Sequence, residues 1–226
     1  MFWQESQEEA RAVPDDVVDI VYQIDCRALP VDHAWALSQA VRTVLPWLEE
    51  EPRAGVHPIH VADSGNGWMR PENAGDLLCL SRRTKLVLRV PRLRIDAAQA
   101  LVGRQLDVAG HALRVDKASL RPLSAITTIF SRYVVSANDM DENAFLRAAV
   151  REMTAFGVHP KKMLCGIGKV IATPDRPVHT RSLMITELSQ QESVLLQQQG
   201  LGPLRHLGCG LFIPHKDMRD LRQALE

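Results

Sequence analysis

The chain has 226 residues, of which 46% are hydrophobic and 24% charged, and its 27 basic and 27 acidic side chains give a formal net charge of zero. This length suffices for one large or two small globular domains, and no apolar run approaches the length of a membrane span. The acidic start, Met1 to Glu5, lacks the basic region of a secretory signal, and the four cysteines form no CxxC pair. We therefore expect a cytoplasmic protein with reduced thiols, no membrane contact and no cysteine-bound zinc.

The first half of the chain alternates between strand and helix patterns. An acidic segment, residues 1–16, is expected to be flexible. Apolar and polar residues alternate from Val18 to Cys26, which predicts a half-buried strand with Tyr22 on its apolar face. Asp32 is expected to cap a helix whose apolar stripe runs to Leu48. The remaining elements expected here are strands at 58–62, 77–80 and 85–90, a short helix at 97–102, and a hairpin at 105–117 that turns at Ala109 and Gly110.

The second half repeats the same order of elements after a short junction at 121–125. Ser189 and Glu192 form a capping-box pattern, which predicts the start of a helix that ends at Gly200. The other elements expected are a strand at 127–136, a helix at 142–156, strands at 163–172 and 178–187, and a terminal strand at 207–213. The whole chain thus fits a duplicated β-α-β-β-α-β plan.

Charge is unevenly distributed despite the net value of zero. Residues 1–51 contain eleven acidic and three basic side chains, whereas residues 81–121 contain three acidic and ten basic ones. In the strand at 85–90, Lys85 and Arg89 share one face with Val87, and Arg82 and Arg83 precede it. This pattern predicts a basic sheet surface that binds phosphates, with an ordinary solvated face as the alternative.

A glycine-rich segment, Gly200 to Gly210, holds four of the chain's thirteen glycines together with Arg205 and His206. Such crowding is expected where a main chain turns tightly or lies against a ligand, and amides with a guanidinium suit a phosphate. Residues 205–210 match the R-x-x-G-x-G loop that binds coenzyme A in acetyltransferases. In those enzymes a strand precedes the loop and a helix follows it, whereas the order here is reversed.

That reversed order resembles the C-terminal glycine-rich signature of the RAMP superfamily of RNA-binding proteins. Further matching segments are Pro30 to Leu37, Leu45 to Leu48, Gly55 to Ile59 and Leu80 to Arg83, which occur in the expected order over nearly the whole chain. The set resembles the Cas-six family of CRISPR-associated endoribonucleases, in its Myxan-type variant. The resemblance implies an α+β fold of two tandem ferredoxin-like (RRM-like) domains, at 17–121 and 126–226, and metal-independent cleavage of CRISPR repeat RNA without a cofactor.

Two histidines are candidate catalytic residues for that reaction. RNA is cleaved when its own 2′-hydroxyl loses a proton and attacks the adjacent phosphorus, which leaves a 2′,3′-cyclic phosphate and a 5′-hydroxyl, and histidine is suited to accept that proton. His33 is the first candidate because it stands at a predicted helix start, where the family resemblance places the catalytic histidine. His57 is the second, as acid or substrate-positioning group. His60 is expected to be structural, and no metal site is expected.

The expected substrate is CRISPR repeat RNA, in hairpin form, which is cut to release guide RNA; other Cas effector subunits are possible further partners. The residues expected to contact RNA are Arg82, Arg83, Lys85, Arg89, Lys161, Lys162, Gly200, Gly202, Arg205, His206, Gly208 and Gly210. Two alternatives stay open: a RAMP subunit that binds guide RNA without cleaving it, and a coenzyme A-dependent acetyltransferase.

Overall fold

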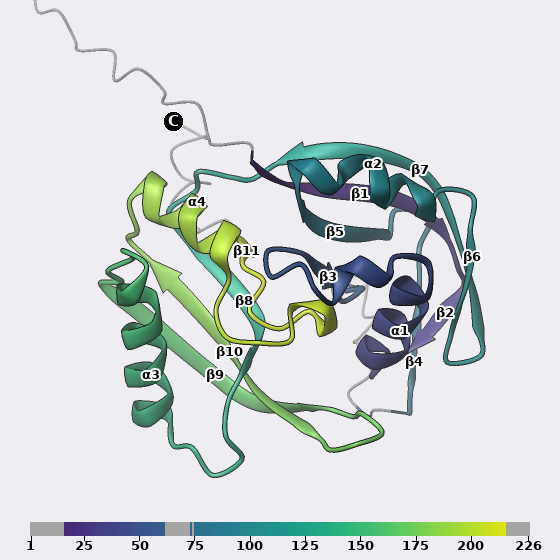
Figure 1. Ribbon diagram of the computed structural model, residues 1–226. Coiled ribbons are helices and arrows are strands. Elements are labelled where there is room, and N and C mark those ends of the chain that lie inside the picture. Colours follow the sequence, from purple (N-terminus) through teal and green to yellow (C-terminus); the bar gives the residue numbers. More distant parts are fainter. Residues whose placement is uncertain (1–15, 62–72, 74, 216–226) are drawn as a thin grey trace, which may run out of the picture.

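The computed structural model describes residues 16–61, 73 and 75–215. Within them the chain forms a five-stranded sheet, a four-stranded sheet and a two-stranded ribbon, with helices packed on the sheets (Figure 1). The chain is therefore an α+β protein, as predicted. The acidic segment expected to be flexible lies outside the described residues except for Asp16.

The first sheet has the strand order β3-β5-β1-β7-β6, and all its neighbours are antiparallel. Its strands are β1 (Val17–Asp25), β3 (Gly55–His57), β5 (Lys85–Pro91), β6 (Gln105–Val108) and β7 (His111–Pro122). Helix α1 (Ala34–Val44) lies between β1 and β3 in the chain, and the short α2 (Ile95–Ala98) follows β5. Without β6, this order and connectivity are those of a ferredoxin-like β-α-β-β-α-β unit.

The second sheet repeats that order as β11-β8-β10-β9. Its elements are β8 (Ile129–Val135), α3 (Glu142–Ala155), β9 (Lys162–Ile171), β10 (Val178–Thr186), α4 (Gln190–Gln199) and β11 (Ile213–Pro214). Helices α3 and α4 cover one face of this sheet (Figure 1). The tandem ferredoxin-like architecture is thereby confirmed.

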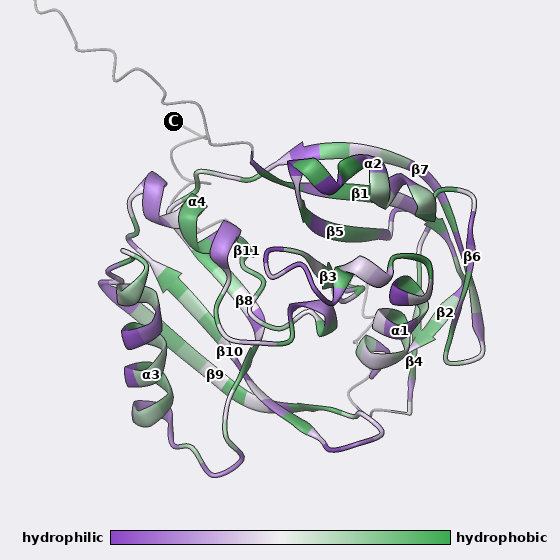
Figure 2. Ribbon diagram, viewed as in Figure 1, coloured by the Kyte–Doolittle hydropathy of each residue, from purple (hydrophilic) through white to green (hydrophobic). Residues whose placement is uncertain are grey.

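The core of each unit lies between one sheet face and its helices. Leu86, Leu88 and Val90 of β5 are fully buried against the first set of helices, and the hydroxyl of the buried Tyr22 donates to Ala98 O at 2.9 Å. In the second unit the strands carry hydrophobic residues, whereas α3 shows hydrophilic residues along one side (Figure 2). The opposite face of each sheet is not covered by these helices.

Several local predictions hold. The β6–β7 hairpin turns at Ala109 and Gly110, whose φ angles are 54° and 81°, as two-residue hairpin turns require. At the start of α4, the Ser189 hydroxyl accepts from the Glu192 amide while the Glu192 carboxylate accepts from the Ser189 amide, which is the predicted capping box.

Other local predictions are wrong. Residues 58–61 form no strand; β3 ends at His57 just before them, because Pro58 has no amide hydrogen to donate to a sheet. Asp32 does not cap α1, since its carboxylate accepts from the Ala172 amide of the second unit at 2.8 Å. The terminal strand is reduced to β11, preceded by a 3-10 helix, η4 (Arg205–Leu207).

The sequence analysis also missed one small element. Strand β2 (Ala28–Pro30) pairs with β4 (Leu77–Cys79) as a separate two-stranded ribbon. A three-residue strand carries too few alternating positions to be recognised from its pattern.

Candidate functional site

A groove of about 290 Å³ lies between the two sheets, on the faces that the helices leave uncovered. Lys85 and Val87 of β5 point into it from the side opposite the buried Leu86 and Leu88. From the second sheet, Phe130 of β8 lines it, next to Ile129, which is buried on the helix side. The groove is therefore built from both ferredoxin-like units.

Four basic side chains line this groove. They are Arg83, Lys85, Arg121 and Arg132, and no Asp or Glu occurs among the lining residues that the structure describes. A concave surface with one sign of charge concentrates a ligand of the opposite sign. Arg132 also stacks over the ring of Phe130, with 5.6 Å from its Cζ to the ring centroid. Such a surface suits an RNA strand, which offers phosphates and base rings.

His57 and His60 lie in the wall of the groove. His57 ends β3 and pairs with Val87 of β5, and its side chain is 14% exposed. Its Nε2 lies 3.8 Å from Oδ1 of Asp19. Burial lowers the pKa of His57 below the ordinary 6.5; the Asp19 carboxylate opposes that shift, and the charges of Arg89 and Arg121 add to it. His57 is consequently neutral at pH 7 and able to accept a proton.

Behind His57 lies a buried ion-pair network centred on Asp19. Arg89 holds both carboxylate oxygens, with Nε 2.9 Å from Oδ1 and Nη2 3.2 Å from Oδ2, and Arg121 donates to Oδ2 at 3.0 Å. Burial by itself raises the pKa of Asp19, but the charge of Arg89 and the side-chain contacts with His57 and Arg89 outweigh it and hold that pKa well below its usual range. Asp19 is therefore ionised throughout the neutral range.

Arg89 also joins the two units. Its Nη1 donates to the carbonyl oxygens of Gln197, at 3.0 Å, and Phe212, at 2.8 Å, both in the second unit. The side chain is 0% exposed. The alternation predicted for β5 is correct, but Arg89 is covered by the second unit, so the prediction that it contacts RNA is wrong.

His33 is buried, with 2% of its surface exposed. Its Nδ1 lies 2.8 Å from Pro30 O, and its Nε2 accepts from the Ile59 amide at 3.0 Å. Both ring nitrogens are thus engaged by the backbone. His33 thus supports the segment that follows His57, and its expected role as the catalytic base stays a prediction.

The glycine-rich segment packs against the segment that carries His57. A Cβ on Gly208 would overlap the Pro58 ring and lie 3.0 Å from Val56 O, and one on Gly210 would overlap Leu201 O. The close approach predicted from the glycines is therefore made, at these two positions, to the protein itself. Gly208 nevertheless lines the groove as well.

Arg205 is only 7% exposed and donates through Nη1 to the carbonyl oxygens of Gln198 and Gln199 at the end of α4. A guanidinium there satisfies carbonyl groups that the helix leaves open. Burial lowers the pKa of Arg205 to about 9. The expectation that this loop could not bury the side chain is wrong, and Arg205 is not exposed for RNA. His206 beside it is half-buried and does not line the groove.

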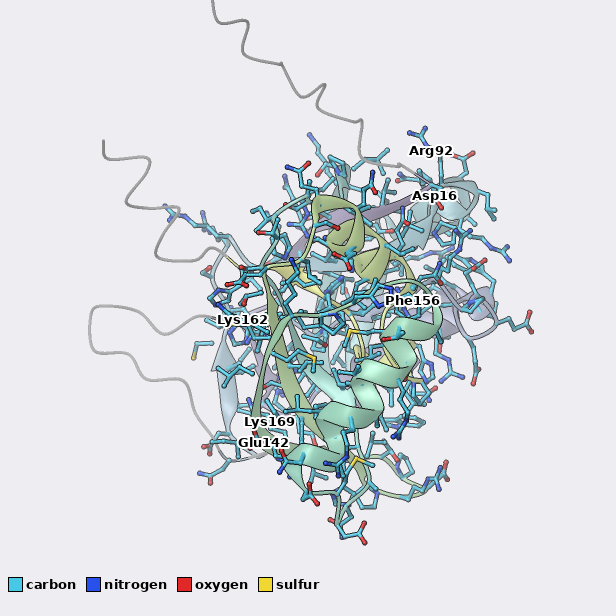
Figure 3. The ribbon with its side chains drawn as sticks, turned by 90° about the vertical axis from the view of Figure 1, so that its left-hand side faces the viewer. Asp16, Arg92, Glu142, Phe156, Lys162 and Lys169 are labelled. Carbon is cyan, nitrogen blue, oxygen red and sulfur yellow. The ribbon has the colours of Figure 1, made fainter. Side chains whose placement is uncertain are left out.

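Of the other residues expected to contact RNA, some line the groove and others lie outside it. Arg83 and Lys85 line the groove with His57 and Gly208, whereas the exposed Arg82 and the remaining candidates do not. Lys162 pairs with Glu187, and it lies at the opposite end of β9 from Lys169 (Figure 3). The remaining candidates outside the groove are Lys161, Lys162, Gly200, Gly202 and Gly210.

Sequence reasoning missed Arg121, Phe130 and Arg132 as groove residues. Arg121 was placed in the junction, whereas β7 continues through it to Pro122 and sets Arg121 opposite Asp19. Phe130 and Arg132 belong to β8, in the other unit. These residues come together only because one sheet packs against the other, and no sequence pattern predicts that packing.

No group of three or more His, Cys, Asp or Glu side chains is arranged to hold a metal ion within the described ranges. Across the same residues, no helix has the length and apolar character needed to cross a membrane.

Comparison with known proteins gives the family. A family model described as Cas6 Crispr matches residues 18–217. The chain belongs to the Cas6 family. The CRISPR-associated endonuclease Cas6 of Myxococcus xanthus (strain DK1622) is 32% identical over 197 residues, which cover 87% of this chain and 81% of that protein. Membership in Cas6 replaces the acetyltransferase interpretation of the glycine-rich segment.

Solved structures share the Cas6 fold. A CRISPR-associated protein Cas6 has a TM-score of 0.59 at 12% identity and covers 88% of this chain and 100% of its own. A Cas6-related protein from Pyrococcus furiosus has a TM-score of 0.59 at 14% identity, with coverages of 89% and 99%. A RAMP protein described as binding different RNA substrates has a TM-score of 0.57 at 12% identity, with coverages of 88% and 100%.

Proposed function

We propose that this Cas6 protein is an endoribonuclease that cleaves CRISPR repeat RNA in the inter-sheet groove, with His57 as the base. The observation that carries the proposal is the position of His57, a histidine of lowered pKa in the wall of a groove that is also lined by Arg83, Lys85, Arg121 and Arg132. The relative from Myxococcus xanthus, named a CRISPR-associated endonuclease, supports the choice of reaction and substrate.

The reaction needs three contributions from the protein. Neutral His57 accepts the proton of a 2′-hydroxyl, whose oxygen attacks the adjacent phosphorus while the bond to the 5′-oxygen breaks. The departing oxygen takes a proton from the second histidine in the wall, His60, or from water. Lys85 and Arg83 stabilise the negative charge that gathers on the phosphoryl oxygens. The products are a 2′,3′-cyclic phosphate and a 5′-hydroxyl, and the atoms of the RNA suffice for both.

Recognition follows from the same surface. Arg121 and Arg132 stand on opposite sheets, so a single strand that enters the groove is held from both sides. Phosphate contacts contribute most of the affinity, while a paired repeat stem outside the groove is recognised by its shape. An unpaired base stacked near Phe130 adds discrimination.

The experiment is cleavage of labelled repeat RNA from the protein's own CRISPR array in the presence of EDTA. Cleavage should persist and leave a cyclic phosphate, because the attacking group belongs to the RNA. A 2′-deoxy substitution directly upstream of the cut should abolish cleavage and preserve binding. Cleavage of the deoxy substrate would contradict the mechanism, and binding of unmodified repeat without any cleavage would instead support a non-cleaving RAMP subunit.

A further inference from the structure

A buried carboxylate faces His57 from two strands away. Asp19 lies on the central strand β1, is 3% exposed and presents Oδ1 to the Nε2 of His57 at 3.8 Å. That distance is within ion-pair range and exceeds a hydrogen bond, and the buried Nε2 has no hydrogen-bond partner within the described part of the chain. A buried ring nitrogen without a partner calls for an explanation, and the carboxylate beside it supplies one.

Asp19 is held in this position by two arginines. Arg89 of β5 binds both its oxygens and is itself anchored to Gln197 O and Phe212 O. Arg121 of β7 approaches Oδ2. The carboxylate is thus fixed between three cationic or protonatable groups, and rotation away from the ring would break two short contacts with Arg89. The other charged or titratable groups along the groove are His60, Arg83, Lys85 and Arg132.

We propose that Asp19 is a positioning residue for His57, which fixes the imidazole as its Nε2–H tautomer and leaves Nδ1 to accept the proton from RNA. In the Nε2–H tautomer, a partly positive hydrogen faces the negative carboxylate, whereas in the Nδ1–H tautomer the lone pair of Nε2 would face it. Electrostatics therefore favours the Nε2–H tautomer. After Nδ1 takes the proton, the same carboxylate stabilises the imidazolium. The role in cleavage rests on the proposed function, whereas the tautomer is a property of the free protein.

The first test is the tautomer of His57 in the wild-type protein without RNA, read from its ring 15N chemical shifts above the pKa. The signals are assigned by their loss in His57→Gln. We expect the Nε2–H form to predominate. Predominance of the Nδ1–H form would overturn the proposal, and the measurement requires no variant of Asp19 to fold.

The second test is the NMR pH titration of His57 in Asp19→Asn. Removal of the negative charge beside the ring should lower the pKa of His57 by about one unit or more. Asp32→Asn is the matched control, because it makes the same change at another carboxylate that accepts a hydrogen bond, from the Ala172 amide, and that does not line the groove. It should leave the titration unchanged. An unchanged pKa in folded Asp19→Asn would contradict the proposal; if thermal denaturation shows that variant unfolded, the wild-type tautomer decides.

Cleavage then separates this inference from the proposed function. In single-turnover assays of Asp19→Asn, the rising limb of the pH–rate profile should move to lower pH by the same amount as the pKa of His57 measured by NMR. The cleavage rate on the plateau of that profile should fall at least tenfold. A histidine that titrates as expected in a protein that cleaves no RNA would overturn the proposed function alone. Normal cleavage with an unmoved limb would overturn the role of Asp19 alone.

Discussion

His33 and His57 differ in what their ring nitrogens contact. In His33 both nitrogens bond to the backbone of neighbouring loops, whereas in His57 one nitrogen faces a carboxylate and the ring borders the groove. From the sequence, both histidines were candidate catalytic residues, and the position of His33 at the start of α1 was predicted correctly. The Ile59 amide that binds His33 and the Asp19 carboxylate that faces His57 are both distant in sequence from the ring they contact, and for that reason the two roles could not be predicted.

The contacts of His33 predict a mainly structural phenotype. His33→Ala removes the bond to the Ile59 amide and the bond to Pro30 O, and should destabilise the fold by about 2 to 4 kcal/mol. For a chain of this size that corresponds to a fall in Tm of roughly 5 to 15 °C, measured by thermal denaturation. The exposed His159 serves as the control, since His159→Ala should change Tm little. An unchanged Tm in His33→Ala would remove its structural assignment.

At the scale of elements, local sequence patterns identified the α3 and α4 helices, the β6–β7 hairpin and the duplicated β-α-β-β-α-β order along the chain. They failed where a partner from the other unit decides the outcome, as for Asp32, which leaves the α1 terminus to bond Ala172. Arg89 shows the same limit: it was assigned to the surface by its charge, and it is buried because carbonyl groups of the second unit bind it. Arg205 was assigned to the surface in the same way, but the carbonyl groups that bind it belong to its own unit, at the end of α4.

Packing of the glycine-rich segment on β3 gives a test at this scale. Gly208 and Gly202 both have positive φ, 86° and 72°, so alanine strains the backbone at either position by about 1 to 2 kcal/mol. Only at Gly208 would the added Cβ overlap Pro58, whereas nothing lies within 4 Å at Gly202. Gly208→Ala should therefore lose about 1 to 3 kcal/mol more stability than Gly202→Ala, together with most cleavage activity. Equal denaturation midpoints would show that the two segments are not in close contact.

At the scale of the whole molecule, the two sheets act as the two walls of one site. Arg89 links them, since its carbonyl partners lie in the second unit and its carboxylate partner lies beside His57. The sequence could predict two similar units, but it carried no signal for the angle between them. The groove, which exists only at that angle, was accordingly predicted in part, through His57, Arg83, Lys85 and Gly208.

The two-walled groove predicts how RNA binding depends on salt. Lys85→Ala on one wall and Arg132→Ala on the other should each weaken repeat binding and lower the slope of log Kd against log salt by about 0.7 to 1, since each loses one phosphate contact. Lys161→Ala, outside the groove, is the comparison. Filter binding over a range of salt concentrations measures all three. If only Lys161→Ala changes the slope, the phosphate track lies along β9 instead.

The central claim is that His57, and not His33, performs the chemistry, and single-turnover cleavage of repeat RNA in EDTA by His57→Ala tests it most directly. The variant should bind repeat RNA with nearly wild-type affinity and cleave it roughly two to four orders of magnitude more slowly, the usual loss for a general acid or base. His33→Ala, measured at a temperature where it is folded, should lose much less. Cleavage by His57→Ala at the wild-type rate would contradict the account.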